Sequence, residues 1–311
     1  MTPAVSIVVP TRNGMTTLPS LVRALDEQDD DASRELVVVD SGSTDGTREY
    51  AERVATRVVT IAPGDFDHGR TRNTGLAASR GCHIVLTVQD ARPTHREWLR
   101  NLLAPLRTNA AVAGAFARQV ARADASAVMR AQLSGWAAAG TTPRTVQVTA
   151  GELETLAPHA RLDRCAFDHV CAAVRRDVWS AIPYQSTPIA EDLIWARDAL
   201  LAGHAIAFVA DAVVEHSHER TAGYEFVRTW ALHQQLVRLF GLRAIPSLGA
   251  LGRSIAVTMR LHHQLARSSG AAIGSHPWRR AMSLAVAWPA GQFVGGWTQS
   301  TGRTRWRPRG I

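Results

Sequence analysis

The segment Val85-Leu86-Thr87-Val88-Gln89-Asp90-Ala91-Arg92-Pro93 decides how the rest of the chain is interpreted. It has the pattern of a buried strand that ends on a polar pair and stops at a proline. In open α/β sheets, ligands bind in the crevice beyond the carboxyl ends of the strands. We therefore expect Asp90 at that rim, where a carboxylate can bind a divalent metal ion.

Strands and helices alternate before this segment. We expect strands at residues 5–10, 35–40 and 57–61, a fourth strand ending at 90, and helices at 17–27 and 72–79. Such alternation over about 110 residues predicts an α/β fold with a mostly parallel sheet and right-handed crossovers.

Several classes of protein are excluded by composition. The chain has no lysine, so a P-loop is impossible, and no G-x-G-x-x-G follows the first strand. The three cysteines form no C-x-x-C pair, which argues against a disulfide framework or a zinc knuckle and favours a reducing compartment. We see no signal peptide and no run of roughly 18 apolar residues. We therefore expect a cytoplasmic protein.

The second part of the chain is less regular. We expect helices at 97–106, 176–181 and 224–240, and strands at 112–116, 170–174, 206–209 and 212–215. Glu191-Asp192 opens a further helix that Gly203 ends, while residues 120–165 show no clear pattern.

Charge divides the chain. No Asp or Glu follows Glu225, although 12 arginines and five of the nine tryptophans do. We expect a domain over residues 1–240, with two halves at about 1–118 and about 119–240. Residues 241–311 would be a basic, Trp-rich helical extension.

Four motifs in order resemble a known family. They are Val5-Ser6-Ile7-Val8-Val9-Pro10-Thr11-Arg12-Asn13 with Val39-Asp40-Ser41-Gly42-Ser43-Thr44-Asp45-Gly46-Thr47, then Phe66-Asp67-His68-Gly69-Arg70-Thr71-Arg72-Asn73 with Thr87-Val88-Gln89-Asp90-Ala91-Arg92-Pro93, then Ala190-Glu191-Asp192-Leu193-Ile194-Trp195-Ala196, and Ala212-Val213-Val214-Glu215-His216-Ser217-His218. Over roughly residues 4–240 the chain resembles the inverting glycosyltransferases of family 2, which have the GT-A fold, and within them the rhamnosyltransferase-like branch.

The resemblance implies roles for individual residues. Asp192 would be the catalytic base and Asp90 the metal-binding acid, with His216 or His218 completing the shell of Mg²⁺ or Mn²⁺. The nucleotide-sugar donor would be bound by Pro10, Thr11, Arg12, Asn13, Asp40, Ser43, Arg72, Asn73, Gln89 and Asp90. The implied donor is dTDP-L-rhamnose, and the acceptor is a glycan or glycolipid. The resemblance also implies that residues 1–118 are the nucleotide-sugar half of the domain and residues 119–240 its acceptor and catalytic half.

Alternatives remain open at several positions. Glu191 could be the base in place of Asp192, or both acids could simply favour a helix N-terminus. Asp40 could be only a turn former. Gln89-Asp90-Ala91 offers one carboxylate where the family pattern has two, so a non-catalytic nucleotide-sugar or glycan-binding relative is the alternative function.

The basic extension suggests a partner. Tryptophan favours the membrane interface, and arginine is attracted to anionic head groups. We expect the extension to dock on the inner face of the membrane, or else to pack on the domain or on a second copy. Nucleic acid is not an expected partner, because no nucleic-acid motif accompanies the charge.

Overall fold

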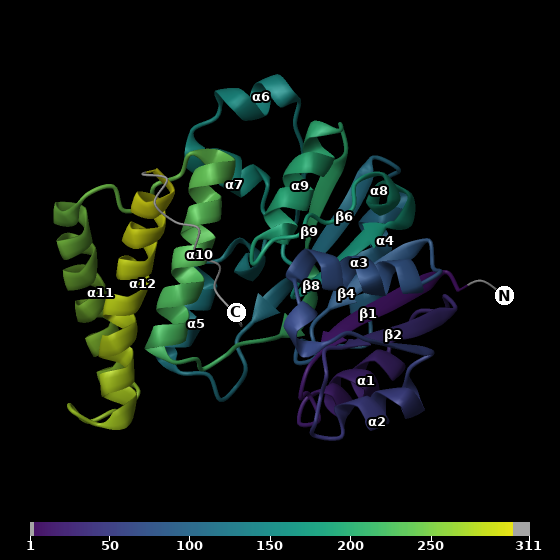
Figure 1. The fold of residues 1–311 in the computed structure, drawn as a ribbon, viewed down its shortest axis with the longest axis horizontal. Helices are drawn as coiled ribbons and strands as arrows, with labels where there is room; N and C mark the ends of the chain where they lie inside the picture. The colour runs from purple at the N-terminus through teal and green to yellow at the C-terminus, as the bar shows by residue number, and fades with distance from the viewer. Residues whose placement is uncertain (1–2, 301–311) are drawn as a thin grey trace.

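The computed structural model of the chain describes residues 3–300 and contains one mixed sheet (Figure 1). The strand order is β3-β2-β1-β4-β8-β6-β9-β5, and β7 also pairs with β9. The strands are β1 Val5–Thr11, β2 Arg34–Asp40, β3 Arg57–Thr60, β4 His83–Thr87, β5 Arg92–Pro93, β6 Val112–Val120, β7 Arg144–Gln147, β8 Cys171–Arg175 and β9 Ala205–Glu215.

The direction of β8 brings the site together. Strands β1 to β4 are mutually parallel, as predicted for this half, and β6 and β9 are parallel to each other. Strand β8 is antiparallel to both β4 and β6. The start of β8 therefore lies at the same edge of the sheet as the ends of β1, β2, β4, β6 and β9.

Two predicted strands differ in detail. β4 ends at Thr87, so Gln89 and Asp90 lie in a turn beyond it, and Arg92–Pro93 forms the short strand β5 against β9. The backbone turns here because Ala91 N donates to Val88 O. The strands expected at 206–209 and 212–215 are one strand, β9, whose pairing with β6 shifts register midway and accommodates the extra residues.

Helices cover both faces of the sheet. One face packs on α1 Leu18–Asp26, α2 Thr47–Val54 and α4 Trp98–Thr108, and the other on α3 His68–Ala78, α8 Arg176–Ala181 and α9 Glu191–Leu201. Helix α9 ends before Gly203, which takes a positive φ. The region without a clear pattern contains α5 Ala127–Ser134, α6 Ala150–Thr155 and α7 Pro158–Arg164.

Three C-terminal helices form a layer beside the sheet. They are α10 Ala222–Phe240, α11 Leu248–Ser268 and α12 His276–Ser300, and α12 packs against both of the others (Figure 1). Trp288 of α12 is buried, and its Nε1 donates to Glu225 Oε2 of α10 at 3.1 Å. Within residues 3–300, no helix combines the length and apolarity that crossing a bilayer requires.

Three tryptophans of the acid-free region pack between helices, whereas Trp297 of α12 is 47% exposed. Trp288 is in a small core, Trp230 Nε1 donates to Thr298 at 3.0 Å, and Trp278 Nε1 donates to His263 at 3.1 Å. These three side chains hold the helices to each other. Trp306 lies outside the described residues.

Candidate functional site

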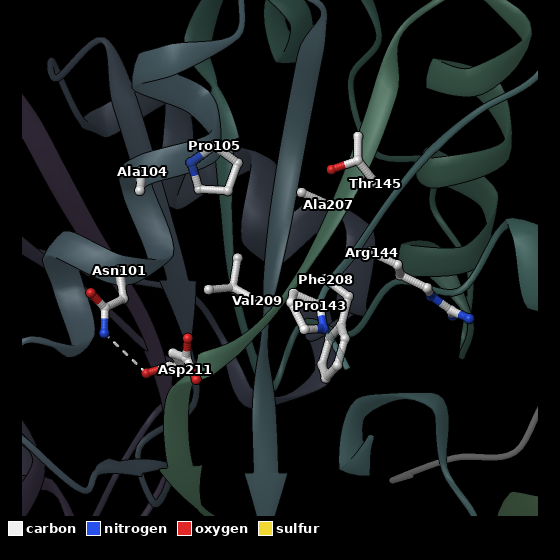
Figure 2. A pocket seen from close by; sticks show the side chains of 10 residues that line it. All are labelled: Asn101, Ala104, Pro105, Pro143, Arg144, Thr145, Ala207, Phe208, Val209 and Asp211. Atoms are coloured by element: carbon white, nitrogen blue, oxygen red, sulfur yellow. Dashed lines mark hydrogen bonds between the residues drawn. The ribbon is translucent and has the colours of Figure 1, made fainter. Parts of the chain in front are cut away.

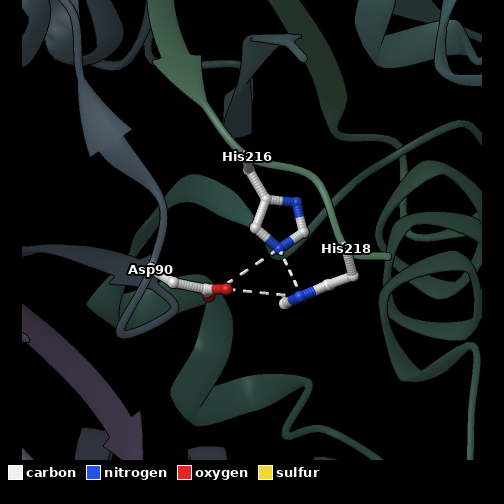
Figure 3. A group of neighbouring side chains, drawn as sticks. All are labelled: Asp90, His216 and His218. Carbon is white, nitrogen blue, oxygen red and sulfur yellow. Dashed lines mark hydrogen bonds and ion pairs between the residues drawn. The ribbon is translucent and has the colours of Figure 1, made fainter. Parts of the chain in front are cut away.

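A carboxylate and two imidazoles meet beyond the ends of β4 and β9 (Figure 3). His218 Nε2 lies 3.4 Å from Asp90 Oδ2, and His216 Nε2 lies 3.8 Å from Asp90 Oδ1. The two Nε2 atoms are 3.0 Å apart. The three residues predicted as metal ligands therefore converge, although Asp90 is separated from both histidines by over 120 positions in sequence.

The donor set fits a divalent cation. Burial is the main cause that lowers the pKa of His216 to about 4, and it also lowers the pKa of His218, so both rings are neutral at pH 7 and offer lone pairs. Neighbouring ligands of an octahedral cation with bonds of about 2.1 Å lie roughly 3 Å apart, which is the spacing of the two nitrogens. Two imidazoles with a carboxylate suit Mn²⁺ and its neighbours in the transition series.

A second group of charged residues lies at the start of α9. Arg72 Nη1 of α3 is 2.8 Å from Glu191 Oε1, and both side chains are buried. His169 Nδ1 is 3.4 Å from the same oxygen, while His169 Nε2 is 2.9 Å from the hydroxyl of Tyr184. Asn73 holds the Tyr184 segment by donating to Tyr184 O at 2.8 Å and accepting from Tyr184 N at 3.1 Å.

The two neighbouring acids titrate in opposite directions. Burial alone would raise the pKa of Glu191, but the Arg72 guanidinium and the His169 hydrogen bond outweigh burial and hold that pKa well below its ordinary range. Burial raises the pKa of Asp192 well above its ordinary value, and the charges of Glu191 and Asp168 raise it further. Asp192 Oδ1 accepts from its own helix, from Leu193 N at 2.8 Å.

The predicted donor loops lie together at the same edge. Gln89 Oε1 accepts from Thr11 Oγ1 at 2.5 Å and from Arg12 N at 2.9 Å, so the turn that carries Asp90 is tied to the end of β1, just beyond Pro10. Asn13 N donates to Ser43 Oγ at 2.8 Å, which joins the loops after β1 and β2.

Asp40 acts as a turn former in this structure. Its Oδ2 accepts from Gly42 N and Ser43 N, both at 3.1 Å. Its Oδ1 is buried and has no hydrogen-bond partner within residues 3–300. The local role that the sequence left open is therefore present, and contact with a nucleoside stays a prediction.

Four residues of the site were missed by sequence reasoning. His169 contacts Glu191; Gln119 Nε2 donates to Asp168 Oδ2 at 2.6 Å; and Gln119 Oε1 is 3.3 Å from His216 Nδ1. Arg228 of α10 lies over the ring of Trp136 at 5.7 Å. Burial raises the pKa of Asp168 and lowers that of His216; the charge of Arg228 opposes the first shift and adds to the second. Of these four residues, only Asp168 and His169 could have been suspected from the sequence, because they form a polar pair just before a predicted strand.

Asp168 is related to both groups. It reaches His216 through Gln119 by hydrogen bonds, and its charge is one cause of the raised pKa of Asp192. That the proposed metal ligands and the candidate base serve one reaction stays a prediction.

A separate hollow of about 370 Å³ lies elsewhere, between α4, β7 and β9 (Figure 2). Figure 2 shows a hydrogen bond at one side of it, where Asn101 Nδ2 donates to the backbone oxygen of Asp211 at 3.1 Å. None of the predicted site residues lines this hollow, so it has no part in the chemistry above.

Comparison with known proteins identifies the family of this chain. The model of "Glycosyl transferase family 2" matches residues 6–171. The O-antigen chain rhamnosyltransferase WbaN of Salmonella anatum is 31% identical over 231 residues, covering 73% of this chain and 70% of that protein. The O-antigen chain rhamnosyltransferase RfbN of Salmonella typhimurium is 27% identical over 230 residues, covering 72% and 69%.

Solved structures share the fold at low sequence identity. The mannosyltransferase PcManGT of Pyrobaculum calidifontis, in complex with GDP-Man and Mn²⁺, has a TM-score of 0.59 at 18% identity, over 98% of this chain and 89% of that one. The glucosyl-3-phosphoglycerate synthase of Mycobacterium tuberculosis has a TM-score of 0.52 at 23% identity, over 79% and 82%. Because the family model spans more than half of the residues and a curated relative is 31% identical over most of both chains, this chain belongs to glycosyl transferase family 2 and is a rhamnosyltransferase-like glycosyltransferase.

Proposed function

We propose that the protein is a metal-dependent, inverting glycosyltransferase that transfers L-rhamnose from dTDP-L-rhamnose to a glycan or lipid-linked glycan. The observation that carries the reaction type is the pair of adjacent acids, Glu191 and Asp192, whose pKa values are driven apart at the edge that also holds Asp90. The names of the curated relatives support the sugar and the class of acceptor.

Asp192 is the catalytic base in this proposal. Glu191 is committed to Arg72 and His169, whereas Asp192 has a raised pKa, which makes its carboxylate a stronger proton acceptor. Asp192 takes the proton of the acceptor hydroxyl as that oxygen attacks the anomeric carbon. The bond from the anomeric carbon to the diphosphate breaks on the opposite face, and the diphosphate leaves with the electron pair.

Asp90, His216 and His218 would hold the metal ion. A divalent cation there neutralises the charge that develops on the departing diphosphate. Thr11, Asp40, Ser43 and the Gln89 turn would hold the nucleoside, because they line the loops after β1, β2 and β4. Arg228 adds a guanidinium near the same edge, where it can pair with phosphate oxygens.

Product analysis tests this function. The purified protein is incubated with dTDP-L-rhamnose, UDP-glucose or GDP-mannose, an O-antigen-type acceptor and Mn²⁺ or Mg²⁺. We expect release of dTDP and a new linkage whose anomeric configuration, measured by NMR, is opposite to that of the donor. Retention of configuration, or donor binding without turnover in every combination, contradicts the proposal.

We also propose that the outer face of α11 docks on an anionic bilayer. Arg253, Arg260 and Arg267 are exposed, and no acid occurs after Glu225 to neutralise them. Apolar side chains lie among these arginines, with Val257 62% and Leu261 47% exposed. A helix with arginines and exposed apolar residues on one side can pair its charges with anionic head groups and bury its apolar side chains in the bilayer interface.

Vesicle co-sedimentation tests the docking. Each arginine near an anionic surface contributes about 1 kcal/mol, so changing all three α11 arginines to glutamine is expected to weaken binding to phosphatidylglycerol vesicles on the order of 100-fold. The matched control changes Arg23 of α1, Arg53 of α2 and Arg57 of β3, which are also exposed, to glutamine. Equal loss in both triple variants would indicate non-specific attraction and would contradict docking through α11.

A further inference from the structure

We propose that Asp168, acting through Gln119, fixes the protonation of the His216 ring so that its Nε2 presents a lone pair to the metal ion. The inference rests on the metal-dependent function proposed above, and it assigns positioning roles to two residues outside the proposed set of metal ligands. It follows from four consecutive contacts at the end of β6 and the start of β8.

The first contacts orient an amide. Val170 N donates to Asp168 Oδ1 at 2.8 Å, which holds the carboxylate in place at the start of β8. Asp168 Oδ2 is 2.6 Å from Gln119 Nε2. Burial raises the pKa of Asp168, while the hydrogen bonds from Val170 N and Gln119 Nε2 favour its ionised form. In that form the carboxylate can only accept hydrogen bonds, so the side-chain amide of Gln119 directs its NH₂ group at Asp168 and its oxygen the other way.

The amide then orients an imidazole. Gln119 Oε1 is 3.3 Å from His216 Nδ1, and an amide oxygen can only accept, so Nδ1 must carry the hydrogen. A neutral ring with hydrogen on Nδ1 has its lone pair on Nε2, the atom that faces Asp90 and His218. Gln119 and His216 are both buried, so water does not compete for these contacts.

The last contact is consistent with this assignment. His216 Nε2 and His218 Nε2 are 3.0 Å apart, a distance at which one nitrogen donates and the other accepts. With the lone pair of His216 fixed, His218 is the donor in the metal-free site. Hydrogen bonding to the remote nitrogen of a ligating histidine typically governs metal affinity by about 10- to 100-fold.

The experiment reverses the polarity of the contacts. In Asp168→Asn, the introduced amide keeps its oxygen toward Val170 N and therefore presents its NH₂ group to Gln119. The Gln119 amide must then flip so that its oxygen accepts from this NH₂ group. Its own NH₂ group then donates to His216 Nδ1. The ring would carry its hydrogen on Nε2. We expect Mn²⁺ affinity, measured by calorimetry without donor, to fall by about 10- to 100-fold.

The double variant Asp168→Asn with Gln119→Glu is the matched rescue. The new carboxylate accepts from the amide introduced at position 168 and from His216 Nδ1, so the original ring form returns. We expect Mn²⁺ affinity to recover to within a few-fold of the parent protein. Thermal melts of all variants confirm that each is folded. Unchanged affinity in Asp168→Asn, or failure of the folded double variant to recover, overturns the proposal.

A second measurement needs no metal. In protein with ¹⁵N-labelled histidine, the two ring nitrogens of His216 have shifts that report which one carries the hydrogen. We expect hydrogen on Nδ1 in the parent protein, on Nε2 in Asp168→Asn, and on Nδ1 again in the double variant. If the ring form follows this pattern but Mn²⁺ does not bind, the metal-dependent function fails and the assigned hydrogen bonds stand. If the ring form does not change, the hydrogen-bond proposal fails by itself.

Discussion

The buried Asp192 side chain destabilises the folded protein when it is ionised, and its proposed role as the catalytic base accounts for an acid at this position. Burial and the neighbouring charges of Glu191 and Asp168 raise its pKa, so the ionised form is less stable in the folded protein than in the unfolded chain. Acids held in such an environment are common at catalytic sites, where function and stability are often opposed.

Asp192→Asn is therefore expected to abolish turnover and also to stabilise the fold. Removing about 1 kcal/mol of unfavourable charge would raise the melting temperature by roughly 1–2 °C at pH 7.5. The gain should shrink as the pH falls below the raised pKa and vanish below the ordinary carboxyl pKa of about 3.9, where the acid is neutral in both states. Calorimetry across pH and donor-binding titrations measure both effects; a variant that loses turnover through a lower melting temperature would argue for a structural role instead.

The same shift predicts how the rate depends on pH. A base must be ionised to accept a proton, and a raised pKa moves the loss of its ionised form to higher pH. We expect kcat/KM to fall as the pH decreases through a value well above that of an ordinary aspartate. Steady-state rates at saturating Mn²⁺ test this, and a profile flat down to pH 4 would exclude Asp192 as the base.

The Arg72–Glu191 ion pair stabilises the folded protein, whereas the ionised form of the neighbouring Asp192 destabilises it. Arg72→Met leaves Glu191 buried without its cation, which typically costs about 3–5 kcal/mol. The pKa of Glu191 is depressed in the fold, so its contribution is present above the ordinary carboxyl pKa and is lost as the pH falls. Urea unfolding at pH 7.5 measures the effect. Arg48→Met removes an exposed pair with Glu52 and should change stability by less than about 1 kcal/mol.

At the scale of elements, the approach of α3 to the segment before α9 positions this ion pair. A Cβ at Gly69, the second residue of α3, would lie 2.0 Å from the carbonyl oxygen of Gln185. We expect Gly69→Ala to destabilise the fold by about 1–3 kcal/mol and to lower the rate, since α3 carries Arg72 and Asn73. Gly223 is the second residue of α10 and has open space around it, so Gly223→Ala is the control and should be neutral or slightly stabilising. Chemical denaturation compares the two, and equal effects would show that packing against Gln185 is unimportant.

At the scale of the molecule, α12 joins the outer helix to the rest of the protein. Trp288 is buried between α10 and α11, where its ring lies 5.4 Å from that of His262. Trp288→Ala should lower the free energy of unfolding by about 3–5 kcal/mol and leave Glu225 without its hydrogen-bond donor. Mn²⁺ affinity should be unchanged, because Asp90, His216 and His218 belong to other elements. Thermal melts with Mn²⁺ titrations test this; loss of Mn²⁺ binding in the folded variant would indicate that the helical layer shapes the site.

The sequence by itself determined the first four parallel strands, because their β-branched runs end at polar turns and need no distant information. It also placed Asp90 and His216 at strand ends, since a strand end can be recognised locally. It could not place Gln119 or Asp168, which are 49 positions apart in sequence and meet only because β8 runs antiparallel between β4 and β6. Nor could it show that Trp230, Trp278 and Trp288 hold helices together, because composition is the same whether a side chain faces lipid or a neighbouring helix. The opposed pKa values of Glu191 and Asp192 were likewise decided by tertiary structure, since burial and the position of Arg72 set them.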